Sequence, residues 1–576
     1  MFWLVVYYLL EYLPVALLGA PVLLWIFLNI RKESHWRAAM LALSWAALVL
    51  SAARVVALLP YTPPDAWSCS RMTPGVAWAM GDRLYHPPGQ GPLLVRMYGP
   101  VSAMVYAPAA LLPTPTAAVL AGAGVNLALF AIPMVWFLRC SGMGATGERP
   151  DASFILVGAA LFALFAAHVT RLLYTAAAVT VDAPAIGLAA CACATLVRCG
   201  GTGPPLLRGL LVGALAAAAL WSKQTLAPIV VALPVYALLV GGWSWGWRCI
   251  LGMVLAAGAI SYALLLAFGV EAMLFHTLIV PARHPWQWPW LDKPHALLRA
   301  MRMIRADAMP ALCLLIVGLG LRLLGAAAAR VGEARRPDST RDVRLSHRIA
   351  AWARANPWLL AALLGVCVLP TTGLAYAKVL GRGNNAAATS YLLLLAACSA
   401  IISALQICFR GSNTSTHPEP STSASTERGL RILKPAARIV AVTVCLAFIL
   451  GIAARPREWL AVPRQFAMWN DLTNNALQIA FQYARQRRGE VYIPQYPLAT
   501  LFSDGRAYHY EPAIQDLHLA GLTLSPRQLD EGLPPRLREI LVRDEIPAHL
   551  PVQLRQRFTR IDHPEQMPGW LVLREP

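Results

Sequence analysis

The segment from Pro60 to Pro100 carries the side chains best suited to chemistry in this chain. It reads PYTPPDAWSCSRMTPGVAWAMGDRLYHPPGQGPLLVRMYGP and contains two carboxylates, Asp65 and Asp82, together with three arginines. A carboxylate near several cations can deprotonate a hydroxyl group while the cations stabilise a departing anion. Asp65 follows two prolines, a position where aspartate is also a common turn or helix-cap residue. We interpret Asp65 as the candidate general base and Asp82, beside Arg83, as a structural residue.

The composition places this segment next to a membrane. Of the 576 residues, 57% are hydrophobic and 14% are charged, and the apolar residues form runs long enough to span a bilayer. The formal net charge is +20, but the residues from position 455 onward hold 15 Arg against 14 Asp and Glu. The positive excess therefore lies in the membrane half, which is typical of the positive-inside bias and argues against a nucleic-acid partner. The 11 cysteines lack ligand spacing and predict neither a disulfide framework nor structural zinc.

The apolar runs predict about twelve transmembrane helices. Their approximate ranges are 4–29, 38–59, 117–138, 153–171, 181–197, 208–221, 225–241, 248–268, 307–325, 357–372, 386–407 and 437–454. We interpret the first as a retained helix, because it lacks a basic N-terminal region and contains Glu11. The proline-interrupted segment 98–112 is expected to lie on the membrane surface or re-enter it, since a full crossing would invert every later connection.

With that assignment, the basic connections all face the cytoplasm, and the polar and aromatic segments gather on the outer face. Prominent among these segments is the loop 60–116. The region after residue 455 has an amphipathic helix pattern at 471–488 and strand patterns at 490–494 and 570–574. We therefore predict an all-α polytopic membrane domain, residues 1–454, with an outer catalytic loop, followed by a small periplasmic α/β domain, residues 455–576.

Several short patterns resemble the GT-C superfamily of integral-membrane glycosyltransferases, particularly its protein O-mannosyltransferase and aminoarabinose-transferase branch. In those families the first large outer loop begins with an acidic residue after a helix, continues to a Gly-x-x-x-Tyr pattern and returns to the membrane at Tyr-x-Pro. The corresponding residues here are Asp65, Gly81 with Tyr85, and Tyr98 with Pro100. Other residues that resemble the family pattern are Asp182 in TVDAP, Lys223 in ALWSKQT, and Lys378, Asn384 and Asn385 in AKVLGRGNN.

The resemblance implies inverting transfer of a sugar from a polyprenyl-phosphate donor to an acceptor hydroxyl, at the outer face of a bacterial cytoplasmic membrane. Asp65 is followed by Ala66 where these enzymes often carry a second acidic residue, so dependence on a divalent metal stays open, and we predict no metal ligands. The absence of a Gly-rich nucleotide loop favours a lipid-linked donor. The sugar and the acceptor are not determined, and the expected partners are this donor and membrane lipids.

A departing phosphate of low basicity needs cations more than it needs a general acid. The candidate donor-phosphate ligands are Lys223, Lys378, Arg382 and Arg83. The candidate substrate-binding residues are Tyr85, Tyr98, Asp182, His284, Trp286, Asn384 and Asn385. We expect Asp65, Lys223 and Lys378 to converge on one cavity.

Two other classes of membrane protein share parts of this pattern. A transporter or flippase of a lipid-linked or anionic substrate should place ionisable residues near the bilayer midplane on broken, repeated helices, and no internal repeat is obvious here. A polymerase or ligase of cell-surface glycans would be expected to use a large late outer loop. In this chain the largest outer features are the early loop and the C-terminal region.

Overall fold

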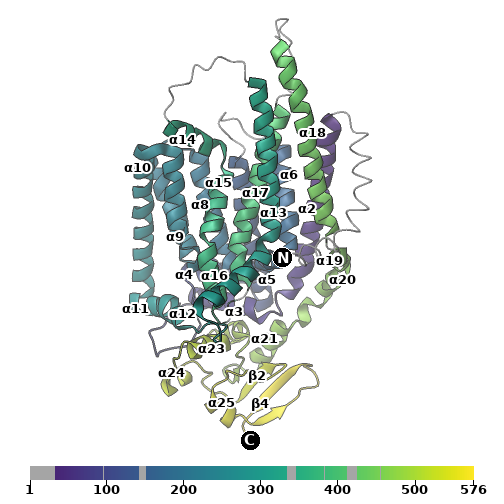
Figure 1. The fold of residues 1–576 in the computed structure, drawn as a ribbon. Helices are drawn as coiled ribbons and strands as arrows, with labels where there is room; N and C mark the ends of the chain where they lie inside the picture. Colours follow the sequence, from purple (N-terminus) through teal and green to yellow (C-terminus); the bar gives the residue numbers. More distant parts are fainter. Residues whose placement is uncertain are drawn as a thin grey trace.

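The structure, a computed structural model, describes residues 33–94, 97–141, 151–333, 345–379, 381, 383–410, 424–454 and 456–576. In this part of the chain, eight helices are long and apolar enough to cross a membrane. A ninth span results if α6 (Ala152–His168) and α7 (Thr170–Ala177), which are bent by 101°, are taken together. Figure 1 shows the helices packed into one bundle, with the C-terminal region at one end. The prediction of an all-α polytopic membrane protein with a small additional region is confirmed.

The other long helices follow the predicted apolar runs, with one exception: the amphipathic helix Leu345–Ala355 lies in none of these runs. They are α2 (Glu33–Leu58), α5 (Pro115–Ser141), α8 (Asp182–Cys199), α9 (Pro205–Leu220), α10 (Ile229–Phe268), α13 (Lys293–Glu333), α14 (Leu345–Ala355), α15 (Trp358–Cys367), α16 (Leu369–Ala377), α17 (Ala387–Arg410) and α18 (Ala424–Ala453). The predicted helix at 4–29 lies outside the described residues.

Helix α10 contains two of the predicted helices. A straight helix over its span, Gln224–Phe268, would be about 67 Å long, roughly twice the thickness of a bilayer core. The chain instead turns at Gly242, whose φ of 67° lies in the left-handed region that favours glycine. After the turn, the backbone at Gly246 lies close to Leu238: a Cβ added at Gly246 would be only 2.9 Å from the Leu238 Cα. The two arms therefore correspond to the predicted runs 225–241 and 248–268.

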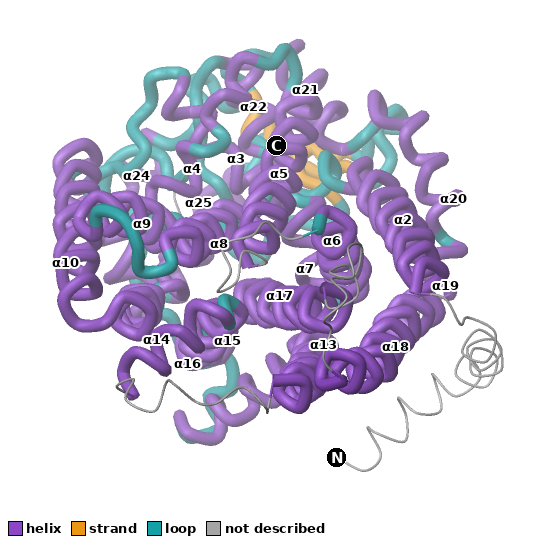
Figure 2. The backbone as a smooth tube through the Cα atoms, turned by 90° about the horizontal axis from the view of Figure 1, so that it is seen from above, coloured by secondary structure: helices purple, strands orange, loops and turns teal. Residues whose placement is uncertain are grey.

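Helix α17 forms the centre of the bundle. Its sequence, AATSYLLLLAACSAIISALQICFR, is apolar on every face, as expected for a helix surrounded by others. In the span Asn384–Phe409, 94% of the apolar window is buried, far more than in the spans of α2 or α10. Figure 2 shows α8, α6, α13 and α15 arranged around it. The segment that enters α17 is consequently held at the middle of one end of the bundle.

The loop after α2 is broken into short helices that cannot span a membrane. They are η1 (Leu59–Tyr61), α3 (Ala66–Ala79), α4 (Pro100–Met104) and η2 (Ala107–Leu111). The apolar stretch Pro100–Leu111 is far shorter than the roughly 20 residues that a crossing needs. This agrees with the expectation that segment 98–112 does not cross. Later short elements on the same side are η3 (Gln224–Leu226), α11 (Val270–Leu274), η4 (Phe275–Ile279), α12 (Val280–Arg283) and η5 (Gly383–Ala386).

The C-terminal region combines helices with one four-stranded sheet. The helical elements are α19 (Pro456–Leu460), α20 (Val462–Phe466), η7 (Ala467–Asn474), α21 (Ala476–Gln486), α22 (Pro497–Asp504), α23 (Glu511–Leu519), α24 (Pro526–Glu531) and α25 (Val552–Arg557), and the strands are β1 (Val491–Tyr492), β2 (Glu539–Arg543), β3 (Arg560–Asp562) and β4 (Trp570–Arg574). The sheet order is β1-β2-β4-β3, with β1 parallel to β2 and the other pairs antiparallel. The sequence patterns identified β1, β4 and α21, but not β2 or β3.

The C-terminal region docks on the early loop through specific hydrogen bonds. The Tyr496 hydroxyl donates to the Pro64 carbonyl at 2.9 Å, and the Tyr510 N–H donates to the Leu93 carbonyl at 3.2 Å. In return, the Leu93 N–H donates to Nδ1 of the buried His509 at 3.0 Å. Residues of α3, α21 and α22 also share one apolar core. The loop and the C-terminal region therefore form one unit at the end of the bundle.

Candidate active site

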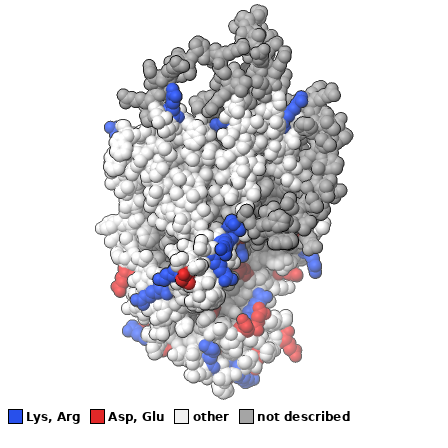
Figure 3. All heavy atoms as spheres, in the orientation of Figure 1, with Lys and Arg blue, Asp and Glu red and all other residues white. Residues whose placement is uncertain are grey.

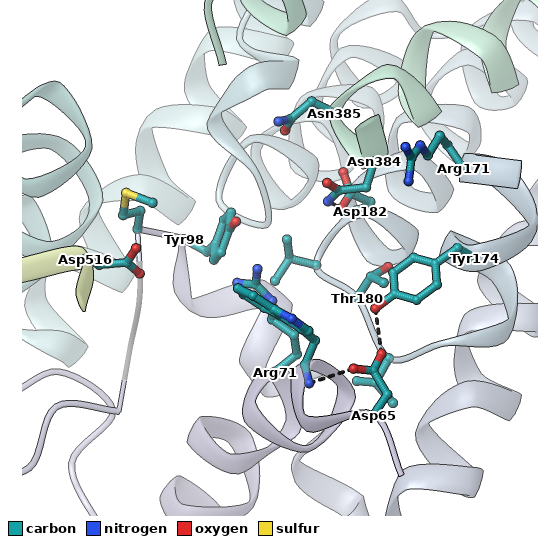
Figure 4. Close-up of a pocket in the computed structure, with 14 residues that line it drawn as sticks. Asp65, Arg71, Tyr98, Arg171, Tyr174, Thr180, Asp182, Asn384, Asn385 and Asp516 are labelled. Carbon is teal, nitrogen blue, oxygen red and sulfur yellow. Dashed lines mark hydrogen bonds between the residues drawn. The ribbon is translucent and has the colours of Figure 1, made fainter. Parts of the chain in front are cut away.

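A cavity of about 390 Å³ lies where the early loop, the end of the helix bundle and the C-terminal region meet. Its lining combines carboxylates, arginines, amides and aromatic side chains from distant parts of the sequence. The lining residues are Asp65, Trp67, Arg71, Met97, Tyr98, Arg171, Tyr174, Val179, Thr180, Val181, Asp182, Asn384, Asn385 and Asp516. Figure 4 shows Asp65 and Tyr174 pointing toward each other, with Asp516 on the far side of Tyr98.

Asp65 is held in the cavity by its position at the start of α3. Its Oδ1 accepts the Trp67 N–H at 2.9 Å, which is a helix N-cap bond. Its Oδ2 accepts the Tyr174 hydroxyl from α7 at 2.7 Å. The Ser68 hydroxyl also donates to Oδ2, at 3.4 Å, so the lone pair left for a ligand is on Oδ1. Asp65 is thus both a cap and a cavity carboxylate, so the two interpretations of this residue do not exclude each other.

Arg71 and Arg171 bring positive charge to the same cavity. Arg71 projects from α3, and its guanidinium carbon lies 4.5 Å from the ring centroid of Tyr98. Its Nη1 is buried without a hydrogen-bond partner among the described residues. Buried guanidinium nitrogens are normally paired, so this atom points to an anionic ligand. Arg171 is exposed on α7, close to the side chain of Tyr174.

Tyr98 is positioned by two close contacts. The Tyr85 hydroxyl donates to the Tyr98 carbonyl at 2.6 Å. The next residue, Gly99, lies against the turn after α9, where an added Cβ would be 1.9 Å from the Trp221 carbonyl oxygen. Only glycine allows the backbones to come this close. Tyr85 itself is buried, so it supports Tyr98 from outside the cavity.

Asp182 and Lys223 form a closed ion pair at the inner wall of the cavity. Lys223 Nζ binds Asp182 Oδ1 and also donates to Asn385 Oδ1 at 2.8 Å, while Asn384 Nδ2 donates to Asp182 Oδ2 at 2.8 Å. The side chains of Asp182 and Lys223 are 2% and 5% exposed, which leaves little room for a ligand on the lysine. The structure thus brings four predicted residues together, with Lys223 behind the cavity wall.

Asp516 comes from α23 in the C-terminal region and is 5% exposed. The buried His284 lies beside it, with Nε2 3.1 Å from the Asp516 carbonyl oxygen and 3.8 Å from its Oδ1. His284 therefore contacts a cavity residue without lining the cavity itself.

Three other predicted residues lie elsewhere. Lys378 Nζ donates to the His284 carbonyl at 2.6 Å and sits 5.3 Å from the ring centroid of Trp286. Neither side chain lines the cavity, so the expected convergence of Lys378 with Asp65 does not occur in the described structure. Arg83 is exposed on the early loop, also away from the lining. Arg382 lies outside the described residues.

Sequence reasoning missed Arg71, Arg171, Tyr174 and Asp516 as site residues. Arg71 had a usable signal, because it lies six positions after a candidate base in a helix-compatible stretch. Tyr174 and Arg171 are close in sequence to Asp182, but nothing in the pattern predicted that the chain bends between α6 and α7. Asp516 had no signal, since only the docking of the C-terminal region brings it to the cavity.

The open carboxylate and the arginines can bind a hydroxyl group and an anion in one space. Asp65 can accept a proton, while Arg71 and Arg171 can balance negative charge that develops nearby. Among the described residues, no group of three or more His, Cys, Asp or Glu side chains is arranged to hold a metal ion.

The chain matches no protein-family model, and no curated protein matches it. Two crystal structures of ArnT from Cupriavidus metallidurans are similar to it. The structure bound to undecaprenyl phosphate has 11% sequence identity and a TM-score of 0.46, over 94% of this chain and 98% of that chain. The apo structure has 12% identity and a TM-score of 0.44, over 92% of this chain and 98% of that chain.

Proposed function

We propose that this protein is an inverting membrane glycosyltransferase of the GT-C type, which moves a sugar from a polyprenyl-phosphate donor to an acceptor hydroxyl. The observation that carries the proposal is the cavity in which Asp65 faces Arg71 and Arg171. One buried guanidinium nitrogen of Arg71 has no hydrogen-bond partner among the residues that the structure describes. This combination of a base with two nearby cations suits a reaction in which a hydroxyl loses a proton and a phosphate departs.

In the proposed step, Asp65 takes the proton of the acceptor hydroxyl as its oxygen attacks the anomeric carbon. The bond between this carbon and the donor phosphate oxygen breaks, and the polyprenyl phosphate leaves with the electron pair. Attack from the face opposite the phosphate inverts the anomeric centre. Arg71 and Arg171 stabilise the charge on the phosphate, and the Tyr174 hydroxyl fixes the carboxylate in position.

The location of the cavity supports transfer over transport. Its polar lining comes from loops, helix ends and the C-terminal region, at one end of the bundle. A transporter would be expected to hold its substrate near the middle of the membrane, between repeated halves. The exposed apolar surface of the membrane-spanning helices, here called the apolar belt, begins next to this end of the bundle. A cavity in this position suits a donor whose phosphate lies at the membrane surface and whose prenyl chain lies in the bilayer.

The same proposal assigns the protein to a bacterial cytoplasmic membrane, with the cavity and the C-terminal region on the outer side. It rests on the basic connections at the opposite end of the bundle. The donor class is defined by its lipid phosphate.

The decisive experiment measures sugar transfer from a panel of radiolabelled polyprenyl-phosphate sugars into membranes that contain wild-type protein or Asp65→Asn. We expect the variant to lose about 10²- to 10⁴-fold in rate, as is typical for removal of a general base. Asparagine keeps the side-chain oxygen that caps α3, so the variant should fold normally.

Asp82→Asn provides the matched control, because it removes a carboxylate from the same loop at a residue that does not line the cavity. It should retain wild-type transfer. Wild-type turnover by Asp65→Asn, with a donor that the wild type uses, would overturn the proposed mechanism. Absence of transfer from every donor by the wild type would count against the donor class itself.

A further inference from the structure

The N-terminal turns of α13 carry an exposed basic face next to the apolar belt. We define the α13 basic face as Arg299, Arg302 and Arg305, all of which are exposed. In Figure 3, Lys and Arg side chains gather over the start of α13, below a broad surface almost free of charge. This face lies at the same end of the bundle as the cavity and the C-terminal region.

The arginines share a helix face with residues that point to the membrane. Arg302 and Arg305 are followed at helical spacing by Met309, Leu312 and Ile316, which are 37%, 38% and 62% exposed. Exposed apolar side chains in a membrane-spanning helix face lipid tails. The same helix face therefore changes from apolar to basic within about 16 Å, which is the change from lipid tails to headgroups.

The length of α13 supports this placement. Its 41 residues correspond to about 62 Å, whereas a bilayer core is about 30 Å thick. The helix must extend beyond the hydrocarbon, and its first turns lie at the level of the headgroups. The exposed Trp290, just before the helix, is of the type that anchors at this interface.

The charges on this face are not neutralised by the protein. No ion pair joins Arg302 or Arg305 to another side chain in the described part of the chain, and Arg299 stacks on Trp288 at 5.0 Å. Of the two nearby carboxylates, Asp292 is bonded to His295, and Asp307 interacts electrostatically with Arg171. Unpaired arginines at headgroup level attract phosphate groups.

We propose that the α13 basic face binds the phosphate groups of anionic membrane lipids. The bound lipid would then lie along α13 with its tails against Met309, Leu312 and Ile316. This inference depends on the membrane position of α13 and not on the proposed transfer reaction.

The test uses the full-length protein in vesicles of phosphatidylcholine that contain a trace of photoactivatable phosphatidylglycerol or photoactivatable phosphatidylcholine. Cross-linked peptides that cover residues 290–316 are quantified by mass spectrometry. We expect the wild type to cross-link phosphatidylglycerol several-fold more than phosphatidylcholine on these peptides. The double variant R302Q/R305Q should lose up to about fivefold per removed arginine, whereas R302K/R305K should retain most of the preference.

R485Q/R488Q serves as the matched control, because it removes two exposed arginines of the C-terminal region, one in the last turn of α21 and one just after this helix. It should leave the cross-linking at α13 unchanged. The proposal fails if the wild type cross-links both lipids equally, or if R302Q/R305Q keeps the wild-type preference. If R302Q/R305Q does not fold, the test uses the wild type alone. Raising the salt concentration to 0.5 M should then lower the ratio of phosphatidylglycerol to phosphatidylcholine cross-linking, because salt screens the charges. An unchanged ratio would also contradict the proposal.

Discussion

Two carboxylates line the same cavity, but their oxygens differ in how far protein groups occupy them. Asp182 is closed, because Lys223 and Asn384 occupy its oxygens and both members of the ion pair are buried. Asp65 is open, because its bonds to Trp67, Ser68 and Tyr174 leave a lone pair on Oδ1. Among the described residues, the nearby Arg71 has a buried nitrogen without a hydrogen-bond partner.

The difference indicates a structural role for the Asp182–Lys223 pair and a chemical role for Asp65. A buried ion pair whose hydrogen bonds are satisfied holds its neighbours in place and has little capacity left for a substrate. Here it connects α8, the turn after α9 and the segment before α17. An open carboxylate near two arginines, one of which has a buried nitrogen without a hydrogen-bond partner in the described part of the chain, gains from binding a ligand. We call Asp182, Lys223, Asn384 and Asn385 the closed centre, and Asp65 with Arg71 and Arg171 the open centre. We expect substitutions in the closed centre to lower stability more than activity, and substitutions in the open centre to lower activity more than stability.

The largest expected effect on stability follows from Lys223→Met, which leaves the buried Asp182 carboxylate without its cation. Breaking one partner of a buried pair typically costs about 3 to 5 kcal/mol. The unfolding of the purified protein in detergent should shift to clearly lower temperature. The double variant D182N/K223M should recover part of that loss, because it removes both charges. If the single variant is as stable as the wild type, the closed centre is not a structural support.

A smaller effect, now on activity, is expected from Arg71→Gln. Loss of a positive group that stabilises a developing anion costs about 10²- to 10³-fold in rate, while the unfolding temperature should change little. Arg83→Gln provides the comparison, since Arg83 belongs to the same loop but is exposed away from the cavity. Loss of transfer in Arg83→Gln with normal transfer in Arg71→Gln would favour the assignment made from the sequence over the one made from the cavity.

The smallest effect concerns pH and tests the contact by which the C-terminal region docks on the early loop beside Asp65. Burial lowers the pKa of His509 to about 4, and its Nδ1 must be unprotonated to accept the Leu93 N–H. The unfolded chain, with a pKa near 6.5, binds the proton first. Stability contributed by neutral His509 is therefore present above about pH 6.5 and is lost as the pH falls toward 4, by roughly 2 kcal/mol at pH 5.

Apparent unfolding temperatures of the wild type and His509→Gln, recorded between pH 7.5 and 5, isolate this contribution from that of His276, whose pKa burial also lowers to about 4. The wild type should lose more stability than the variant over this range. Parallel curves for the two proteins would show that the contact between His509 and Leu93 does not titrate as inferred.

Much of the architecture could be predicted from local patterns. The apolar runs located most of the long helices, and the prolines at positions 100, 108 and 113 indicated that the segment before α5 does not cross. Helix ends and the turn at Gly242 were less accessible, because apolar composition continues across them. Strands β2 and β3 lacked a clear alternating pattern, since their pairing depends on partners that are distant in sequence.

For the site, the sequence by itself determined which stretch carries a carboxylate at a helix start and which residue types accompany it. It also selected Asp182, Lys223, Asn384 and Asn385, although their spacing does not say that they bind one another. Only the tertiary structure decided that Lys223 is occupied, that Lys378 lies apart, and that Arg71, Tyr174 and Asp516 reach the cavity. The physical reason is that pairing and burial of charge are set by contacts between segments that are distant in the sequence, and local sequence patterns do not encode these contacts.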